Sequence, residues 1–331
     1  MKIVVDSAIP YLQGILEPYA EVVYIRGLDI DHDDIVDADA MIIRTRTWVN
    51  KSLLEGTKVK FIATATIGTN HIDLDYCAEH GIKVCSAPGC NARGVLQWVA
   101  AALHHIVTTD NATPDKYTLG VVGVGNVGSL VSQYARHWGF KVMECDPPRA
   151  EREGGEFYTF EQIVENCDII TLHVPLNKST RYMINVDVLE RMPKHTTIIN
   201  AARGGVVVNR AVMYSGHRYI FDVWESEPEL DPKVVHHAML GTPHIAGYSA
   251  QGKANATARC VNALAEFFDL PIVDWYPEAV RRPSPRLLSW EELCQTIVSH
   301  YDIAAESEHL KLWFGESERL RDTYTYREEY F

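Results

Sequence analysis

The feature that most constrains the fold is a glycine-rich turn between an apolar run and a helical pattern. Three glycines follow the spacing Gly-x-Gly-x-x-Gly, at Gly123, Gly125 and Gly128. The next run, Ser129–Trp138, has helical spacing, and Gly139 is placed to end it. A strand, a tight glycine turn and a helix in this order predict the first unit of an open parallel α/β sheet.

Each glycine serves a separate purpose in a turn of this kind. Gly123 makes the tight turn, Gly125 lets the backbone approach a pyrophosphate, and Gly128 lets the helix and strand pack closely. The amides around Asn126 and Val127 would hold the pyrophosphate at the positive end of the helix dipole. The pattern alone is weak evidence, but its strand and helix context indicates a dinucleotide site.

An acidic residue supports this interpretation and indicates which dinucleotide binds. Asp146 lies 23 residues after Gly123, at the end of the next predicted strand. An acid there accepts a hydrogen bond from the adenosine ribose and repels a 2′-phosphate, which favours NAD over NADP. Arg149 nearby weakens this preference slightly. The competing interpretation is a glycine turn in an α/β unit that binds nothing.

Strand and helix patterns alternate on both sides of this motif, which indicates parallel sheets covered by helices. Five strands are predicted before it, at Ile3–Val5, Val22–Ile25, Met41–Ile43, Phe61–Thr64 and Lys83–Cys85. Six are predicted from it onward, at Leu119–Val124, Lys141–Cys145, Asp168–Val174, Thr196–Asn200, Tyr219–Val223 and roughly Met239–Ile245. Further helices are predicted at Tyr11–Tyr19 and Leu74–His80, from Asn91, from Thr159 with a capping box to Gln162, and at about Ala250–Phe268.

These patterns predict two Rossmann-like, doubly wound α/β domains. Residues 1–93 and 248–275 are assigned to a discontinuous substrate domain, and residues 94–247 to an NAD-binding domain. Pro277, Pro283 and Pro285 mark a linker, so residues 276–331 are expected to form a separate C-terminal segment that is charged and helical.

Composition excludes several classes of protein. The 331 residues include 31 Lys and Arg against 44 Asp and Glu, a net charge of −13 that argues against binding to nucleic acid or anionic membranes. The seven cysteines are scattered without a Cys-x-x-Cys pair, which is typical of reduced thiols in a cytoplasmic protein without a metal site. No segment has the pattern of a signal peptide or a membrane span, so a soluble protein is expected.

Three candidate catalytic residues each follow one of the last three predicted strands: Arg203, Glu227 and His244. Open α/β sheets bind ligands at the carboxyl ends of their strands. Hydride transfer from a hydroxy acid needs a base for the hydroxyl proton and a cation for the carboxylate, which suits a histidine backed by a carboxylate and an arginine. On spacing alone, a surface arginine and a buried structural histidine are equal alternatives. His104, His105, His236 and His237 lack this context and are predicted to be structural or exposed.

These residues make the chain similar to the D-2-hydroxyacid dehydrogenase family, from residue 1 to about residue 275. The resemblance rests on the glycine turn with Asp146, and on the segments 202–204, 222–228 and 242–247. It implies Arg203 as the substrate-orienting cation, Glu227 as the partner of the base, and His244 as the acid/base. It also implies NAD contacts by Asp146, Val174, Ala201, Ala202, Arg203, Asp222 and Gly247, and substrate contacts by Thr45, Thr66 and Tyr248.

A narrower resemblance is to a branch of that family whose substrate is a small phosphorylated hydroxy acid. It rests on residues 63–73, 87–91, 145–150 and 244–248. We add Arg44 and Arg46 as candidate anchors for the phosphate, because alternate residues of a strand point to the same face. An exposed arginine pair at a strand end is the equal alternative. Residues 310–330 resemble part of a dimerisation segment, which implies a homodimer.

The chain departs from the family pattern in three places. The segment from Arg203 to Glu227 is shorter by roughly a helical turn, so the helix after Asn209 is predicted to be stunted. Thr45 stands where serine is expected, and the dimerisation segment is shorter than the resemblance implies.

Two other functions stay open: a dehydrogenase of another acid such as 3-phosphoglycerate or glycerate, and a non-catalytic NAD(H)-sensing protein. The intact catalytic set argues against the sensor.

Overall fold

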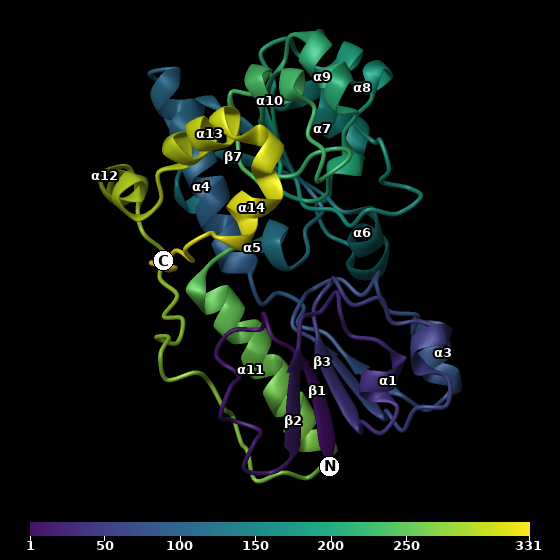
Figure 1. Ribbon diagram of the computed structural model, residues 1–331. Helices are drawn as coiled ribbons and strands as arrows, with labels where there is room; N and C mark the ends of the chain where they lie inside the picture. The colour runs from purple at the N-terminus through teal and green to yellow at the C-terminus, as the bar shows by residue number, and fades with distance from the viewer. The chain divides into compact units, whose positions relative to one another are not determined.

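The computed structural model describes residues 1–331, which divide into two compact units. The first unit contains residues 1–91 and 249–283, and the second contains residues 92–248 and 284–331. Each unit has a sheet flanked by helices, and the C-terminal segment runs among the helices of the second unit (Figure 1). None of the helices combines the length and the apolar character that crossing a bilayer requires.

The first unit is built on a five-stranded parallel sheet in the order β2-β1-β3-β4-β5. Its strands are β1 (Lys2–Asp6), β2 (Glu21–Ile25), β3 (Ala40–Ile43), β4 (Phe61–Thr64) and β5 (Lys83–Cys85). Its helices are α1 (His32–Ile35), α2 (Lys51–Leu54), α3 (Leu74–Glu79) and α11 (Ala250–Phe267). Strands β3 and β4 are buried along their whole length, as expected for central strands covered on both faces. All five predicted strands are confirmed.

The helix predicted over Tyr11–Tyr19 is wrong, because this stretch is a series of turns. Leu12 and Leu16 are both buried, and their spacing of four residues produced the helical pattern. Gly14 has a φ of +87° and Tyr11 a φ of +65°, values that a right-handed helix does not contain. The apolar side chains therefore reach the core from turns.

The second unit contains a six-stranded parallel sheet in the order β11-β10-β9-β8-β6-β7. Its strands are β6 (Thr118–Val122), β7 (Lys141–Cys145), β8 (Ile169–Leu172), β9 (Thr197–Asn200), β10 (Arg218–Phe221) and β11 (Leu240–Gly241). Its helices before the C-terminal segment are α4 (Ala92–Thr109), α5 (Asn126–His137), α6 (Pro147–Glu153), α7 (Phe160–Asn166), α8 (Val186–Arg191), α9 (Asn209–Ser215) and α10 (Pro232–His237). Helix α9, within the shortened segment from Arg203 to Glu227, has only seven residues.

The edge strand β11 is much shorter than the predicted Met239–Ile245, since it covers only Leu240–Gly241. Pro243 has no N–H to donate to a neighbouring strand, and His244 has a φ of +60° instead of an extended backbone. The next two amides donate to the side chain of Asp222 rather than to the sheet. The sheet therefore ends here, and an irregular loop begins at the position of the candidate catalytic histidine.

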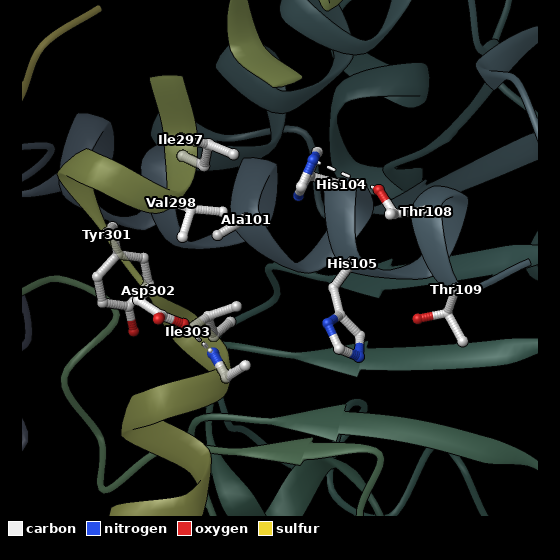
Figure 2. A pocket seen from close by; sticks show the side chains of 11 residues that line it. Ala101, His104, His105, Thr108, Thr109, Ile297, Val298, Tyr301, Asp302 and Ile303 are labelled. Carbon is white, nitrogen blue, oxygen red and sulfur yellow. Dashed lines mark hydrogen bonds between the residues drawn. The ribbon is translucent and has the colours of Figure 1, made fainter. Parts of the chain in front are cut away.

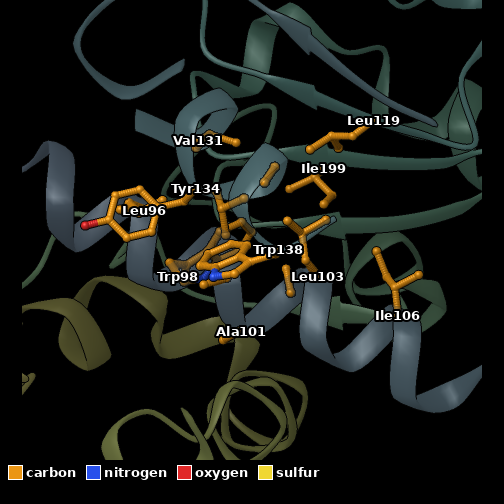
Figure 3. Close-up of a cluster of buried hydrophobic side chains, with 14 of the residues drawn as sticks. Leu96, Trp98, Ala101, Leu103, Ile106, Leu119, Val131, Tyr134, Trp138 and Ile199 are labelled. Atoms are coloured by element: carbon orange, nitrogen blue, oxygen red, sulfur yellow. The ribbon is translucent and has the colours of Figure 1, made fainter. Parts of the chain in front are cut away.

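The largest core of the second unit lies around α4 and α5 (Figure 3). Trp98 of α4 is fully buried, and Tyr134 of α5 and Trp138, directly after α5, pack in the same cluster. The C-terminal segment, with α12 (Trp290–His300), α13 (Ile303–Leu312) and α14 (Ser317–Asp322), adds Leu293 and Phe331 to this core. The segment is therefore an integral part of the second unit. All seven cysteines are free thiols.

The third glycine of the motif gives a test of the packing in the second unit. A Cβ atom on Gly128 would lie 2.0 Å from the carbonyl oxygen of Gly123, which no real contact permits. We expect Gly128→Ala to lower the free energy of unfolding by about 2 kcal/mol, as overpacking does, although alanine normally favours a helix. Urea unfolding followed by tryptophan fluorescence measures this.

The matched control is Gly315→Ala, because a Cβ atom there would meet no atom within 4 Å. We expect this variant to stay within about 0.5 kcal/mol of the wild type. Equal stability of the two variants would contradict the packing assigned to Gly128.

Candidate active site

The glycine turn has the geometry that binding of a dinucleotide requires. Gly123 has a φ of +86°, and α5 begins at Asn126 directly after Gly125. Gly123 and Gly128 are required by packing within the protein, since a Cβ atom on either would clash with main-chain atoms. A Cβ atom on Gly125, in contrast, would meet no protein atom within 4 Å. Gly125 therefore faces open space at the start of a helix, which fits the close approach of a pyrophosphate.

Asp146 directly follows the neighbouring strand β7, and Arg149 lies in the first turn of helix α6. The Asp146 carboxylate accepts the amide N–H of Val124 at 2.8 Å and that of Arg149 at 3.0 Å, which fixes it beside the glycine turn. The Arg149 guanidinium pairs with Glu153 at 2.6 Å and donates to the Val124 carbonyl at 2.7 Å. Because this cation is neutralised within the protein, it is poorly placed to hold a 2′-phosphate. This arrangement favours NAD.

The candidate base and its partner are in direct contact. The distance between His244 Nδ1 and Glu227 Oε2 is 2.7 Å, and both side chains are partly buried. The other carboxylate oxygen of Glu227 accepts the amide N–H of Trp224 at 2.7 Å. The main chain of His244 is held by its N–H, which donates to the Asp222 carbonyl at 2.8 Å. The imidazole and the carboxylate are therefore positioned by fixed backbone.

The environment of Glu227 keeps it ionised. Burial tends to raise the pKa of its carboxyl group, but three other influences outweigh burial. These are the hydrogen bond and charge of His244, the N–H of Trp224 and the positive charge of Arg321. The pKa of Glu227 therefore lies below its ordinary value, and the group is a carboxylate at neutral pH.

Arg203 follows β9, and its turn is braced by the side chain of Asn200. The Asn200 amide donates to the Arg203 carbonyl at 3.1 Å, while its oxygen accepts the Ala202 N–H at 3.0 Å. Desolvation by surrounding protein lowers the pKa of Arg203, and the negative charge of Glu227 opposes this shift. Arg203 therefore lies within electrostatic reach of Glu227. The structure brings Arg203, Glu227 and His244 together at the carboxyl ends of β9, β10 and β11.

Asp222 is a buried carboxylate that holds the loop carrying His244. Its side chain is 1% exposed, and it accepts the Thr242 hydroxyl at 2.6 Å and the amides of Ile245 and Ala246 at 2.7 and 2.9 Å. Burial raises the pKa of Asp222, although the charge of His244 and these hydrogen bonds act in the opposite direction. The carboxylate oxygens are therefore committed to the loop.

The other predicted NAD contacts lie along the same edge of the second sheet. Val174 follows β8, and its side chain borders Gly123, since a Cβ atom there would lie 2.9 Å from it. Ala201 and Ala202 follow β9 directly, and Gly247 lies three residues after His244. Each therefore follows a strand of the sheet that carries the glycine turn.

Arg321 is a residue near this site that the sequence did not reveal. It lies on α14, and with Ser317 and Glu318 it lines a small crevice shared with Glu227 and His244. Its positive charge is one of the influences that lower the pKa of Glu227. The charged, helical pattern of the C-terminal segment carries no signal that would distinguish this arginine from its exposed neighbours.

Three predicted substrate contacts lie in the first unit. Thr45 follows β3 and Thr66 follows β4, so both lie at the carboxyl edge of the first sheet. The Thr66 hydroxyl is 2.7 Å from that of Thr64. Arg44 Nε donates to the buried carboxylate of Asp6 at 3.0 Å.

The prediction that Arg44 and Arg46 lie on one face of a strand is wrong. Strand β3 ends at Ile43, and the Thr47 N–H bonds the Arg44 carbonyl at 3.3 Å in a turn. Alternation along a strand therefore does not place these two arginines on one face, and only the local charge supports a phosphate site here.

A separate groove of about 240 Å³ lies between α4 and the helices of the C-terminal segment (Figure 2). His104 and His105 line it, and His104 Nε2 lies 3.4 Å from the Thr108 hydroxyl. Burial lowers the pKa of both histidines, so they are neutral at pH 7. The groove contains none of the three candidate catalytic residues, and these histidines are half-buried neighbours of the core.

Comparison with known proteins shows which family the chain resembles. Residues 97–246 match the family model described as D-isomer specific 2-hydroxyacid dehydrogenase, NAD binding domain. The chain is 41% identical to the erythronate-4-phosphate dehydrogenase of Bacteroides thetaiotaomicron, over 99% of this chain and 97% of that protein. It is also 41% identical to the protein of that name from Ectopseudomonas mendocina, over 82% of this chain and 73% of that protein.

A solved structure shows the same fold. The D-lactate dehydrogenase of Aquifex aeolicus, complexed with NAD and lactic acid, matches with a TM-score of 0.67 and 23% identity. The match covers 81% of this chain and 96% of that one. The two parallel-sheet units of this chain therefore have the fold of that structure. On the length and identity of these matches, the chain belongs to the D-isomer specific 2-hydroxyacid dehydrogenase family.

Proposed function

We propose that this protein oxidises 4-phospho-D-erythronate to 2-oxo-3-hydroxy-4-phosphobutanoate with NAD, a step of pyridoxal 5′-phosphate biosynthesis. The single observation that carries the chemistry is the 2.7 Å contact between His244 and Glu227. Arg203 lies near enough for its charge to interact with that of Glu227. The relatives named erythronate-4-phosphate dehydrogenase support the choice of substrate. Oxidation removes a proton from the hydroxyl group and a hydride from C2 of the acid.

His244 is suited to take the hydroxyl proton. An ionised carboxylate only accepts hydrogen bonds, so the contact with Glu227 requires the hydrogen of the neutral imidazole to be on Nδ1. Nε2 then carries the free lone pair and acts as the base. When Nε2 accepts the proton, the ring becomes a cation, and the Glu227 carboxylate stabilises it.

Arg203 is suited to orient the substrate. Its guanidinium fork matches a carboxylate with two parallel hydrogen bonds, and it stays positively charged at any working pH. The partial desolvation that lowers its pKa also strengthens its attraction for an anion. In this proposal Arg203 holds the C1 carboxylate and polarises the C2 oxygen, and Tyr248, Thr45 and Thr66 contact the rest of the substrate.

The cofactor contacts follow from the glycine turn. The proposal assigns the pyrophosphate to the amides at Gly125, Asn126 and Val127, and the adenosine ribose to Asp146. When bound, NAD supplies the hydride acceptor. Fixed positions of Gly125 at the helix start and of Asp146 at the end of β7 support this assignment.

The first test is removal of the proposed base. We expect His244→Ala to reduce kcat for NADH formation from 4-phospho-D-erythronate by about 10²- to 10⁴-fold, while NADH still binds, because proton transfer loses its acceptor. Initial rates of NADH absorbance measure turnover, and nucleotide fluorescence measures binding.

The control variant is His195→Ala, which breaks the other histidine–carboxylate pair of this unit. His195 Nε2 lies 2.8 Å from Asp168, but the histidine side chain is 65% exposed. We expect its turnover to stay close to that of the wild type. If His244→Ala retains turnover, His244 is not the base. If the wild type turns over no hydroxy acid, the results favour the NAD(H)-sensing function instead.

The lowered pKa of Glu227 predicts how stability depends on pH. A carboxyl group whose folded pKa is below its unfolded value of 4.5 stabilises the fold above that value. This stabilisation is lost as the pH falls through the folded pKa. We therefore expect the stability advantage of the wild type over Glu227→Gln to shrink as the pH falls below about 4.

Urea unfolding at a series of pH values measures this difference. The control is Glu266→Gln, on helix α11. Its free energy of unfolding should equal that of the wild type at every pH of the series. A wild-type advantage that grows on acidification would show that Glu227 is not held as a carboxylate.

Arg44 offers a test of the substrate class. If it binds the substrate phosphate, Arg44→Ala should lower the preference for 4-phospho-D-erythronate over D-erythronate, as the ratio of kcat/KM values, by about tenfold or more. Arg26→Ala, which removes an exposed arginine paired with Asp29 at 2.8 Å, should leave the ratio unchanged. An unaltered preference in Arg44→Ala would reject the phosphate role.

A further inference from the structure

The loop that carries His244 has an unusual backbone, and its polar groups need partners. His244 has a φ of +60°, and the loop leaves the sheet after Gly241. Asp222 satisfies three of its N–H groups, since the amide of His244 reaches the Asp222 carbonyl and the next two reach the Asp222 carboxylate. The Tyr248 N–H donates to the Ile245 carbonyl within the loop. The carbonyl groups of the same loop do not bond to Asp222. Because buried backbone carbonyls also need hydrogen-bond donors, a buried irregular loop is stable only if other groups supply them.

One side chain satisfies three of these carbonyls. Arg327, near the end of the chain, donates to the carbonyl oxygens of Ile245 at 2.9 Å, of Tyr248 at 3.2 Å, and of Ala246. It also donates to the Gly94 carbonyl, at the start of α4, at 2.8 Å. The guanidinium therefore joins the loop to the longest helix of the second unit.

Arg327 has the surroundings of a buried structural cation. It is only 8% exposed, and its guanidinium lies 4.4 Å from the ring centroid of Tyr301. Its five hydrogen bonds go to four carbonyls and to the Tyr324 hydroxyl at 3.4 Å, and none goes to a carboxylate. Such a group is too enclosed to bind a substrate, but it fixes main-chain atoms in place.

Neighbours of Arg327 fix a second part of the site. The ring of Tyr248 lies 6.1 Å from the rings of both Tyr324 and Tyr326 in edge-on contacts. The segment around Arg327 therefore holds the main chain next to His244 and also packs against the side chain of Tyr248.

We infer that Arg327 is a positioning residue for the acid/base histidine, acting through the main chain of residues 245–248. This inference rests on the proposed function of His244. Asp222 holds the N–H groups of the loop from one side, and Arg327 holds its carbonyl groups from the other. Together they keep His244 Nδ1 directed at Glu227, so the C-terminal segment takes part in catalysis without touching the substrate.

The test compares Arg327→Met, Arg327→Lys and the control Arg319→Met. Arg319 lies on α14 and forms an exposed ion pair with Glu316, so its replacement should leave kcat and the Kd of NADH unchanged. We expect Arg327→Met to lower kcat about 100-fold, the effect of a misplacement of about 1 Å, with the Kd of NADH within about threefold of the wild type. Arg327→Lys keeps the charge but not the planar fork, so its kcat should be intermediate.

A double-mutant cycle separates positioning from a general loss of stability. If Arg327 acts through His244, Arg327→Met should lower the residual turnover of His244→Ala by less than about threefold. Hydrogen exchange of the amides of Ile245 and Ala246 should be faster in Arg327→Met and unchanged in Arg319→Met. A full 100-fold further loss in the double variant would overturn the inference.

The remaining outcomes are also decisive. A folded Arg327→Met with kcat within twofold of the wild type overturns the inference, and if that variant does not fold, the same criterion applies to Arg327→Lys. Loss of turnover in His244→Ala but not in the Arg327 variants rejects the inference alone. Turnover retained in His244→Ala rejects the proposed function, and the inference with it.

Discussion

The buried carboxylate of Asp222 is the group on which the candidate site depends. It stands at the end of β10 and accepts hydrogen bonds from the Thr242 hydroxyl and from two amides of the loop that follows. The Thr242 hydroxyl in turn accepts the indole N–H of Trp98 at 2.9 Å. These hydrogen bonds connect Trp98 of α4, through Thr242 and Asp222, to the loop that carries His244. Burial of a carboxylate is unfavourable unless it is well bonded, so this network fixes one arrangement of the loop.

Two carboxylates near His244 have opposite pKa shifts, and the shifts indicate different roles. Burial dominates for Asp222 and raises its pKa, because its hydrogen bonds come mainly from neutral donors. For Glu227 burial is outweighed by the imidazole of His244 and by other neighbours, so its pKa is lowered. Glu227 contacts the imidazole directly and is placed to stabilise an imidazolium during proton transfer, whereas the Asp222 oxygens accept hydrogen bonds from the loop. The same functional group, a carboxyl, therefore shapes the loop in one case and supports the proposed chemistry in the other.

The sequence predicted well those features that depend on short-range constraints. The glycine turn, the central strands and the strand-end positions of Arg203, Glu227 and His244 follow from local steric rules and from the edge of a parallel sheet. The turns at Tyr11–Tyr19 escaped prediction, because two buried leucines four residues apart look the same in a helix and in a set of turns.

Long-range contacts could not be predicted from local patterns. Arg321 and Arg327 belong to a charged, helical stretch whose spacing resembles that of any exposed segment. Their positions beside Glu227 and the His244 loop depend on how the C-terminal segment folds onto the second unit. The turn at Arg44 likewise depends on Asp6, a residue 38 positions away in sequence.

The C-terminal segment also covers the exposed edge of the sheet at the short strand β11. An edge strand exposes unpaired backbone groups that invite pairing with another chain. Here the Gly241 N–H donates to the buried hydroxyl of Ser307, on α13, at 3.0 Å, and Leu310 of the same helix lies near the Gly241 backbone. The segment that covers the edge before His244 is the one that supplies Arg327 after it. Because both ends of the loop that carries His244 are bonded to one segment, the segment that protects the sheet edge also limits how far the histidine can move.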